Sequence, residues 1–500
     1  MNYDVIVIGA GLGGLTAGAR LARNGKKVLM IEQHNIPGGC ATTFKRKDYT
    51  VEVGLHEMDG LDDIDAKKDI FEELDIFNNI ELIRLPEFYR YINPNIDFVM
   101  PDDAQKAISK LIKKFPDEEK GVRYYFKQMR GIRKEVPNLP RSKFWRFLKL
   151  PFYPLLYPHV VRNAKKTIGS FLDENIQNED LKLLLTANLG YYSDDPYGMS
   201  MVYFSSAQDG YYAGGWYIKG GSQKLSDYLA SCITDNGGEV IYSHTVEKVL
   251  VENNRAVGIK YRKKSKKHTE PMNAKAKYII ANNAVPALAN MLPKEQSLKL
   301  NVKIKGLEKS CSVITLYLGF NNTPKSLGNK YYSTFIANDE VKNLSDFADD
   351  LKQATFDKRH LIFVDYSQIN SGLTPEGKSF GVLATTDYGK DWENLSKDNY
   401  KKKKEEVSQA MIARLEKLVP GIKENIEYYE LGTAKTVERY TLNPGGATYG
   451  FAQTLQQAGD KRFGQSMPVK NLHIASAWGF PGGGFTGAIL SGYLTSLKIK

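Results

Sequence analysis

Three glycines and one acid near the N-terminus have the spacing of a site that binds a dinucleotide. Gly9, Gly11 and Gly14 form a GxGxxG pattern, and Glu32 lies 18 residues beyond Gly14. In such a site the first glycine makes a tight turn, the second lets the backbone approach a pyrophosphate, and the third allows close helix packing. The acid accepts hydrogen bonds from the ribose hydroxyls of an adenosine. We therefore expect a dinucleotide at this turn, whose other contacts are Ala10, Leu12, Gly13 and Gln33.

The residues on either side of the glycine turn have the patterns of two strands and a helix, which would position the turn. An apolar run predicts a buried parallel strand at residues 4–9, and an apolar-faced helix follows it and ends at Gly25. A second β run, Val28 to Ile31, leads directly into Glu32. A bare GxGxxG can also be a structural loop, but here strand, helix, second strand and acid together predict a βαβ unit.

Short glycine-rich and polar motifs recur at intervals along the rest of the chain. They are GGC at residues 38–40, GLH at 54–56, GGWYIKGG at 214–221, ANNAVP at 281–286 and AWGFPGGGFT at 477–486. A Gly-Gly pair taken alone predicts only a plain turn. In this order, the motifs resemble the signature of the phytoene desaturase, carotenoid isomerase and retinol saturase family of FAD-dependent oxidoreductases. That family lies within the flavin amine oxidase superfamily.

The resemblance implies FAD as the cofactor and assigns further contacts to it. These are Gly38, Gly39, Cys40, Gly54, Leu55, Val246 at the adenine, Asn283, Ala284, Trp478, Gly484, Phe485 and Thr486. Cys40 stands where the superfamily usually has Arg, and GGC with GLH favours the saturase and isomerase members. Ser476, Ala477 and Trp478 replace an Asp that binds the ribityl chain in many flavoproteins, so the ribityl contact is left open.

The fold class that follows is α/β, with two interleaved domains. The resemblance implies a Rossmann-like FAD-binding domain built from discontinuous segments, residues 1–75, 210–290 and 435–500. Residues 76–209 and 291–434 would form an α+β substrate domain that faces the membrane. Its many aromatic residues suit a long conjugated chain, although ordinary core packing explains them equally well.

Flavin carries the redox chemistry in such proteins, so the chain itself needs at most a proton donor. The candidates are His56, Glu57 and Asp59, because they follow Gly54 where the family's chain passes the isoalloxazine. Alternatively, His56 only packs or caps a turn. Cys40 has no local His or acid partner, so we interpret it as a packing residue and not a nucleophile. The scattered cysteines form no metal pattern, and we expect no metal.

The function that the resemblance implies is oxidoreduction at a carbon–carbon double bond of a polyene or other long hydrophobic lipid. Saturation, isomerisation and desaturation share this scaffold, and each needs an electron donor or acceptor that the sequence leaves unidentified. Two alternatives use the same frame. One is an FAD-dependent amine oxidase, and the other is a non-catalytic flavin-binding, membrane-associated protein.

Charge and targeting patterns restrict the partners. Lys and Arg number 69 against 57 Asp and Glu, a formal charge of +12, yet no nucleic-acid motif accompanies the basic runs, so we expect no nucleic acid. An early acid argues against an export signal and three scattered cysteines indicate a reducing compartment, so we expect a cytoplasmic protein. Residues 141–162 mix aromatic rings with basic side chains. They form either a buried segment or a peripheral contact with an anionic membrane at its inner face, and the surplus charge favours the membrane.

Overall fold

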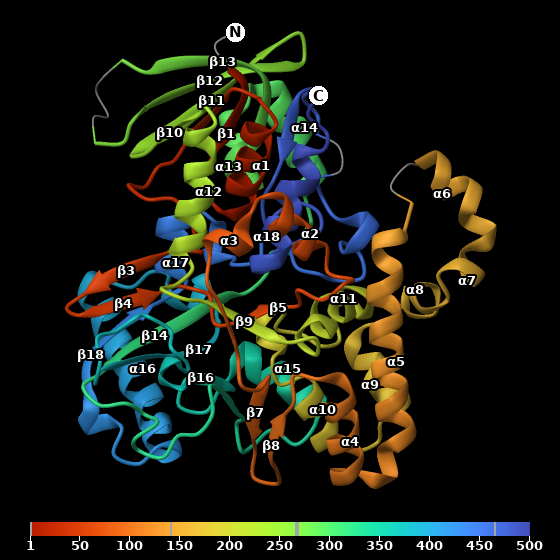
Figure 1. Ribbon diagram of the computed structural model, residues 1–500, viewed down its shortest axis with the longest axis vertical. Helices are drawn as coiled ribbons and strands as arrows, with labels where there is room; N and C mark the ends of the chain where they lie inside the picture. The colour runs from red at the N-terminus through yellow and green to blue at the C-terminus, as the bar shows by residue number, and fades with distance from the viewer. Residues whose placement is uncertain (1–2, 141–142, 266–269, 465–466) are drawn as a thin grey trace.

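The computed structural model describes residues 3–140, 143–265, 270–464 and 467–500 (Figure 1). Two large sheets lie at opposite ends of the molecule, and helices pack around each of them. Both termini lie beside the first sheet, at the top of Figure 1. Within the described ranges, no helix is both long and apolar enough to cross a membrane.

The first sheet has the strand order β10-β2-β1-β13-β12-β11, and β19 also pairs with β13. Strands β10, β2, β1, β13 and β19 are parallel, whereas β11, β12 and β13 pair antiparallel. Their bounds are β1 Tyr3–Ile8, β2 Val28–Ile31, β10 Glu239–Ile241, β11 His244–Glu252, β12 Arg255–Lys263, β13 Met272–Ala281 and β19 Leu472–Ile474. The two strands predicted around the glycine turn are therefore present as β1 and β2.

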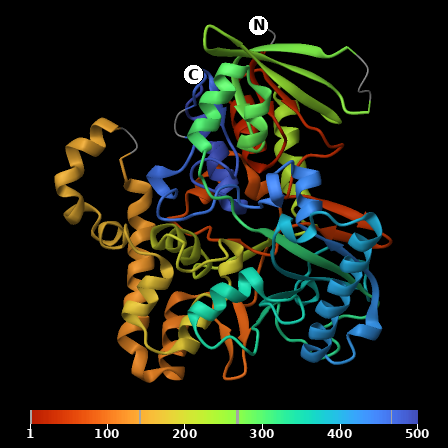
Figure 2. The same cartoon turned by 180° about the vertical axis from the view of Figure 1, so that it is seen from behind.

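Helices cover both faces of this sheet, which explains why β1 is apolar on both sides. Val5 and Val7 belong to the core formed with α1, α12 and α18, whereas Ile6 and Ile8 belong to the core formed with α13 and α14. Figure 2 shows α13 and α14 on the face that Figure 1 hides. The bounds are α1 Leu12–Arg23, α12 Gln223–Asp235, α13 Val285–Met291, α14 Lys294–Ile304 and α18 Gly484–Ser496. Helices α1 and α18 lie very close, because a Cβ at Gly492 would overlap the carbonyl oxygen of Gly13.

The second sheet has the order β18-β14-β17-β16-β15-β7-β8 and is antiparallel except where β15 meets β7. One face packs on the long helix α16 (Lys397–Leu418), through residues such as Leu316 and Met411. The other face, which includes Tyr317, belongs to the core shared with the first sheet. The strand bounds are β7 Tyr89–Ile92, β8 Asp97–Met100, β14 Ser312–Phe320, β15 Ser333–Ile336, β16 Leu361–Asp365, β17 Ser379–Asp387 and β18 Ile426–Gly432.

A helical layer lies beside the second sheet, and two small sheets lie between the large ones. The helices are α4 Ala104–Lys114, α5 Glu119–Glu135, α6 Lys143–Lys149, α7 Tyr153–Leu156, α8 Pro158–Asn163, α9 Ile168–Asn175, α10 Glu179–Leu185 and α11 Met201–Tyr211. The small sheets pair β3 (Thr43–Arg46) with β4 (Tyr49–Glu52), and β9 (Gly215–Ile218) with β5 (Met58–Asp59) and β6 (Leu82–Arg84).

The two sheets draw their strands from alternating parts of the chain. Every strand of the first sheet lies within residues 1–75, 210–290 or 435–500, and every strand of the second within 76–209 or 291–434. The mixed α/β fold with a discontinuous Rossmann-like part is therefore confirmed, while the boundaries between the two domains stay a prediction.

A buried histidine makes the stability of the second sheet sensitive to acid. His360 stacks on Phe335, its Nε2 lies 2.7 Å from the carbonyl oxygen of Ala187, and burial lowers its pKa to about 4. The unfolded chain binds a proton at this site below about pH 6.5, but the folded chain does not until about pH 4. Stability is therefore lost as the pH falls through this window, at about 1.4 kcal/mol per pH unit, and is unaffected above it.

As the pH is lowered from neutral to about 5, we expect the melting temperature of the His360→Gln variant to fall less than that of the wild type. Thermal unfolding measured across this pH range tests the expectation, with His34→Gln as a control for loss of a half-buried histidine. Parallel pH profiles for the wild type and His360→Gln would contradict it.

Candidate functional site

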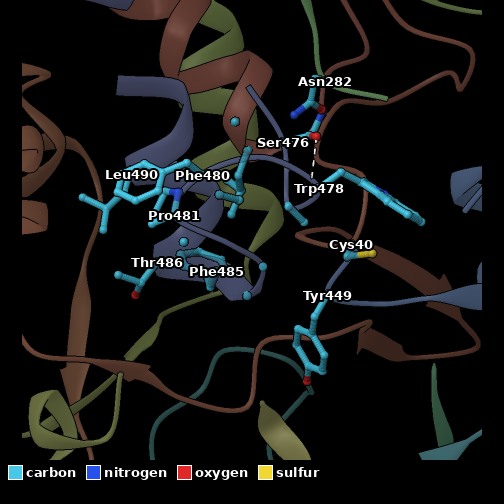
Figure 3. A pocket seen from close by; sticks show the side chains of 18 of the residues that line it. Cys40, Asn282, Tyr449, Ser476, Trp478, Phe480, Pro481, Phe485, Thr486 and Leu490 are labelled. Carbon is cyan, nitrogen blue, oxygen red and sulfur yellow. Dashed lines mark hydrogen bonds between the residues drawn. The ribbon is translucent and has the colours of Figure 1, made fainter. Parts of the chain in front are cut away.

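A cavity of about 870 Å³ lies at the carboxyl ends of the parallel strands of the first sheet. Figure 3 shows Cys40, Tyr449, Phe485 and Thr486 around this cavity, although they come from distant parts of the chain. Most of the sequence-predicted contacts line it: Gly9, Gly11, Leu12, Gly13, Glu32, Gln33, Gly38, Gly39, Cys40, Gly54, Leu55, Val246, Asn283, Ala284, Trp478, Gly484, Phe485 and Thr486. The predicted contacts Ala10 and Gly14 are not among its lining residues. Such a position, outside the carboxyl ends of parallel strands, is where α/β proteins bind their ligands.

The glycine turn connects β1 to α1 with the geometry that its spacing predicts. Gly9 has φ +92°, and a Cβ at Gly14 would overlap the carbonyl oxygen of Gly9, so only glycine allows this close approach. Helix α1 begins at Leu12, its N-cap Gly11 has no side chain, and no described side chain caps it. The first-turn N–H groups and the positive end of the helix dipole are thus available to an anion.

Asn282 joins three segments at this point, and sequence reasoning missed it. Its Oδ1 accepts a hydrogen bond of 3.0 Å from the N–H of Gly11, and its amide donates to the carbonyl oxygen of Ala475. The residue follows β13 directly and thereby connects the β1–α1 turn to the loop between β19 and α18. Asn283, and not Asn282, was predicted as a contact in the Asn-Asn-Ala motif. The position of Asn282 directly after a central strand was the sequence signal that could have identified it.

Glu32 holds the turn as well as lining the cavity. Its Oε2 accepts a hydrogen bond of 2.7 Å from the N–H of Ala10, and its Oε1 accepts one of 2.8 Å from the N–H of His34. The start of β11 lies beside it, because the N–H of His244 donates to the Glu32 carbonyl oxygen at 2.9 Å, and Val246 follows. Glu32 and Val246 therefore lie at one end of the cavity, where the predicted ribose and adenine contacts would be.

Helix α18 directs a second uncapped N-terminus at the cavity. Its N-cap is Gly483, Gly484 has φ +83°, and a Cβ on Gly484 would meet open space. Thr486 donates a hydrogen bond to Asp59, and Trp478 is buried with its Nε1 donating to Asn443 at 2.9 Å. Helix α18 begins two residues before Thr486.

These residues fit a polar, anionic ligand such as a dinucleotide, which the glycine turn and the two helix N-termini would hold. The Oδ1 of Asn283, which lines the cavity, is buried and accepts no hydrogen bond from any described residue. A buried acceptor without a partner is costly, so a bound donor would satisfy it. Together with the open space at Gly484 and the two uncapped helices, this orphan acceptor indicates a site built for a polar, anionic ligand.

The three candidate proton donors occupy different environments. His56 lies 3.0 Å through Nδ1 from the hydroxyl of Tyr191, and burial lowers its pKa to about 4, so the ring is neutral near pH 7. Burial raises the pKa of Glu57 well above its ordinary value, with the nearby Asp59 carboxylate adding to the effect. This shift favours the protonated form of Glu57, and its Oε1 has no partner among the described residues.

Asp59 is instead held in a buried ion-pair cluster. The ammonium of Lys67, which is fully buried, lies 2.5 Å from Asp65 Oδ2 and 3.7 Å from Asp59 Oδ1. Asp59 also accepts the hydroxyl of Thr486 at the start of α18. Of the three candidates, Asp59 thus links α2 (Ala66–Glu73) to α18, and Glu57 is the group with a proton to donate.

Glu52 positions the loop that carries these residues, and it was not singled out in the sequence. It is fully buried and accepts hydrogen bonds from both the N–H and the hydroxyl of Ser222, each at 2.7 Å. It also accepts from the N–H groups of Gly54 and Leu55, at 3.3 and 3.2 Å. The GLH loop is therefore fastened to the start of α12 by one carboxyl group.

A second cavity of about 410 Å³ continues from the first towards the second sheet. Cys40, His56, Tyr191 and Tyr449 line both cavities, and burial raises the pKa of the Cys40 thiol, so it is not an activated nucleophile. The walls contributed by the second sheet and its surroundings are Val313, Thr315, Tyr317, Phe335, His360, Ile362, Ala384, Thr385 and Thr386. An elongated apolar ligand could therefore extend from the first cavity into the second.

Comparison with known proteins agrees with this geometry. The family model described as flavin containing amine oxidoreductase matches residues 12–499. Similar proteins include all-trans-retinol 13,14-reductase of Danio rerio (26% identical, covering 98% of this chain and 85% of the relative) and chloroplastic prolycopene isomerase of Daucus carota (28%, 100% and 80%). A third is the neurosporene-forming phytoene desaturase of Rhodobacter capsulatus (24%, 99% and 93%).

Solved structures share the fold. Putrescine oxidase bound to putrescine superposes with a TM-score of 0.63 at 15% identity, covering 100% of this chain and 99% of its own. Cyclohexylamine oxidase from Brevibacterium oxydans gives a TM-score of 0.61 at 15% identity, with the same coverage of both chains. At these identities the likeness establishes the architecture alone.

We expect Asn282→Ala to reduce both flavin retention and stability, because it leaves the Gly11 N–H and the Ala475 carbonyl without a partner, at about 1–3 kcal/mol for each group left buried. Asn282→Asp should also fail, since a carboxylate cannot donate to Ala475. The flavin-to-protein absorbance ratio and the melting temperature measure both effects. Asn322→Ala, on an exposed loop, is the matched control, and a wild-type ratio in Asn282→Ala would refute the role.

Proposed function

Because the chain belongs to the flavin containing amine oxidoreductase family, we propose that it is an FAD-dependent oxidoreductase acting on a carbon–carbon double bond of a polyene or other long hydrophobic lipid. The names of its relatives describe reduction of retinol, isomerisation of prolycopene and desaturation of phytoene. A saturase, isomerase or desaturase of carotenoid or retinoid type is therefore the function class that the family supports.

The observation that carries the proposal is the aromatic continuation of the cofactor cavity. Beyond His56, the walls are formed by Tyr191, Tyr192, Tyr203, Tyr211 and Tyr449, and Phe335 lines the second cavity. Burial raises the pKa of Tyr191 and Tyr211 well above the ordinary value, so these rings stay uncharged. Uncharged aromatic faces suit a flat, conjugated and apolar substrate.

FAD supplies, when bound, a centre that accepts or delivers a hydride. The residues that would hold it are the α1 turn, Glu32 and Val246 at the adenosine end and the first turn of α18 at the other end. Asn283 would offer its unpartnered acceptor to a donor on the cofactor. Trp478 and Ser476 stand where the ribityl chain would pass, and the N–H of Trp478 donates to Ser476 at 3.3 Å.

The environment of Glu57 favours some of the three candidate reactions over the others. Saturation requires a proton on the second carbon, and isomerisation through a protonated polyene requires one as well, whereas desaturation requires a base. A carboxyl group whose pKa burial raises well above its ordinary value holds its proton more readily, and so suits a donor better than a base. The Glu57 carboxyl would pass its proton to a substrate carbon, which favours the saturase and isomerase reactions.

The amine oxidase alternative shares the cofactor frame, and the solved neighbours that bind amines share the fold. A protonated amine needs a carboxylate or another anionic partner inside the cavity. Burial favours the uncharged form of Glu57, and Asp59 is already engaged with Lys67 and Thr486. These environments favour an uncharged substrate.

The direct test is anaerobic. The flavin in the purified protein is prepared both oxidised and photoreduced, and a retinol, a carotene, an unsaturated fatty acid or an amine is added separately to each form, while the flavin spectrum and the product mass are recorded. A gain of two hydrogens identifies a saturase, a loss identifies a desaturase, and unchanged mass with altered retention identifies an isomerase. Oxidised flavin reduced by an amine alone, or no turnover with any compound, would overturn the proposal.

We expect Glu57→Gln to slow the lipid reaction by about 100-fold or more while leaving flavin binding unchanged, because the amide occupies the same volume without an acidic proton. In the wild type, the rate should fall as the pH rises through the elevated pKa of Glu57, since the donor is then lost, and this fall should be absent from the variant. Single-turnover rates across pH measure both. Tyr191→Phe, which removes only the hydroxyl near His56, controls for changes in packing. An unchanged rate in Glu57→Gln would exclude Glu57 as the proton donor.

A further inference from the structure

Helices α6 and α7 extend away from the body of the molecule, and both Figure 1 and Figure 2 show them standing clear of the two sheets. Residues 144–156, here called the apolar finger, carry eight large hydrophobic side chains that face solvent. Phe147 is 81% exposed and Leu155 is 80% exposed. The others are Phe144, Trp145, Leu148, Leu150, Phe152 and Leu156. Single exposed apolar residues are ordinary, but a contiguous group of this size marks a surface that is covered by something else.

The acidic and basic residues in the finger's own stretch of the chain are of one sign. Between Glu135 and Asp173 the chain contains no acidic residue, and its basic residues are Arg141, Lys143, Arg146, Lys149, Arg162, Lys165 and Lys166. Aromatic rings with lysines and arginines beside them are the composition that binds the headgroup boundary of an anionic bilayer. A protein surface would need many matched acids, whereas anionic lipids supply negative charge at any position.

The base of the finger is firmly attached, in contrast to its tip. Glu135 in α5 accepts the N–H groups of His159 and Val160, at 3.2 and 2.8 Å, and Tyr157 donates its hydroxyl to the carbonyl oxygen of Asn138 at 2.8 Å. Gly131 allows this contact, because a Cβ there would overlap the ring of His159. These contacts pack helix α8 against α5 and thereby attach the exposed apolar residues that precede α8 to the body of the molecule.

The large cavity reaches the surface at the base of this finger. Its lining includes Pro140, Arg146, Val160, Ala164 and Asp460, in addition to the residues that surround the cofactor site. Arg146 forms a 2.7 Å ion pair with Asp460, whose side chain is 61% exposed. One continuous cavity therefore connects the region of His56 and Glu57 with an opening beside the apolar finger.

From these observations we infer that the apolar finger docks on an anionic lipid bilayer and places the cavity opening at the membrane surface, where an apolar lipid enters directly. Docking rests on the finger and its charges alone, whereas the entry route rests on the proposed function. Direct entry removes the need for a water-insoluble substrate to cross the aqueous phase, which its apolar surface strongly disfavours.

Flotation of the full flavin-loaded chain with vesicles tests the docking. We expect binding to phosphatidylcholine vesicles containing about one-third phosphatidylglycerol and much weaker binding to pure phosphatidylcholine. Raising the salt from about 0.1 to about 1 M should weaken binding without abolishing it, because only the electrostatic part is screened. Wild-type protein that fails to float with anionic vesicles would overturn the inference.

The double variant Phe147→Asp with Leu155→Asp should bind anionic vesicles at least about tenfold more weakly, because it places two charges in the part that enters the bilayer. Leu298→Asp with Val302→Asp on α14 is the matched control, since these side chains are 58% and 74% exposed on a helix that packs on the first sheet and is separate from the finger, and should leave binding unchanged. Unchanged flavin content and melting temperature show that both variants fold. Equal binding of the two double variants would overturn the assignment to the finger.

Fluorescence locates the contact independently of activity. Brominated lipids should quench the emission of Trp145, and Trp145→Phe should lose this quenching while the other tryptophans, which include the buried Trp392 and Trp478, contribute little. A second copy of the chain is the competing occupant. If the wild type sediments as a dimer, and if Phe147→Asp with Leu155→Asp makes it monomeric without reducing vesicle binding, the finger is a dimer contact and the inference is wrong.

Turnover measurements distinguish docking of the finger on the membrane from entry of the substrate through the cavity opening. If the wild type binds vesicles but converts a vesicle-borne polyene no faster than the finger variant does, the entry route is wrong and docking stands. If no polyene is converted from vesicles or from detergent, the proposed function fails while the flotation result remains.

Discussion

The structure depends on one constraint, which is that segments from the beginning, middle and end of the chain must meet at the carboxyl ends of β1, β13 and β19. The side-chain amide of Asn282 satisfies it by accepting from Gly11 and donating to Ala475. These three loops also deliver the two uncapped helix N-termini to one cavity. Close approach of α1 and α18, which Gly492 permits, packs the C-terminal half of α18 against the first turn of α1.

Burial then decides the protonation of the groups beside that cavity. Desolvation disfavours the charged forms of His56 and Cys40, and it favours the protonated form of Glu57 for the same reason. Asp59 lies close by but has Lys67 and Thr486 as partners. This arrangement suits chemistry on an apolar chain better than chemistry on a cation.

The second sheet and the helical layer give this chamber its length and its opening. Two tyrosines beside the second sheet hold the GLH loop in place. Tyr332 donates to the carbonyl oxygen of His56, and Tyr366 donates to that of Leu55. The cavity extends past them in one direction to the sheet and in the other to the base of the apolar finger. The finger projects away from the molecule, so its apolar side chains find no cover within the chain.

The amino-acid sequence alone determined the βαβ unit and the family, and it predicted many of the residues that line the cavity, because local spacing of glycines, strand residues and an acid encodes a turn whatever the rest of the chain does. It also marked His56, Glu57 and Asp59, but could not rank them, since their protonation depends on neighbours far along the chain. Asn282 and Glu52 were not predicted, because a lone Asn or Glu has no local pattern and acquires its role only from long-range contacts. Whether residues 144–156 are core or surface was equally beyond the sequence: burial is a property of the packed chain, and only the tertiary structure left these side chains exposed beside the opening of the cavity.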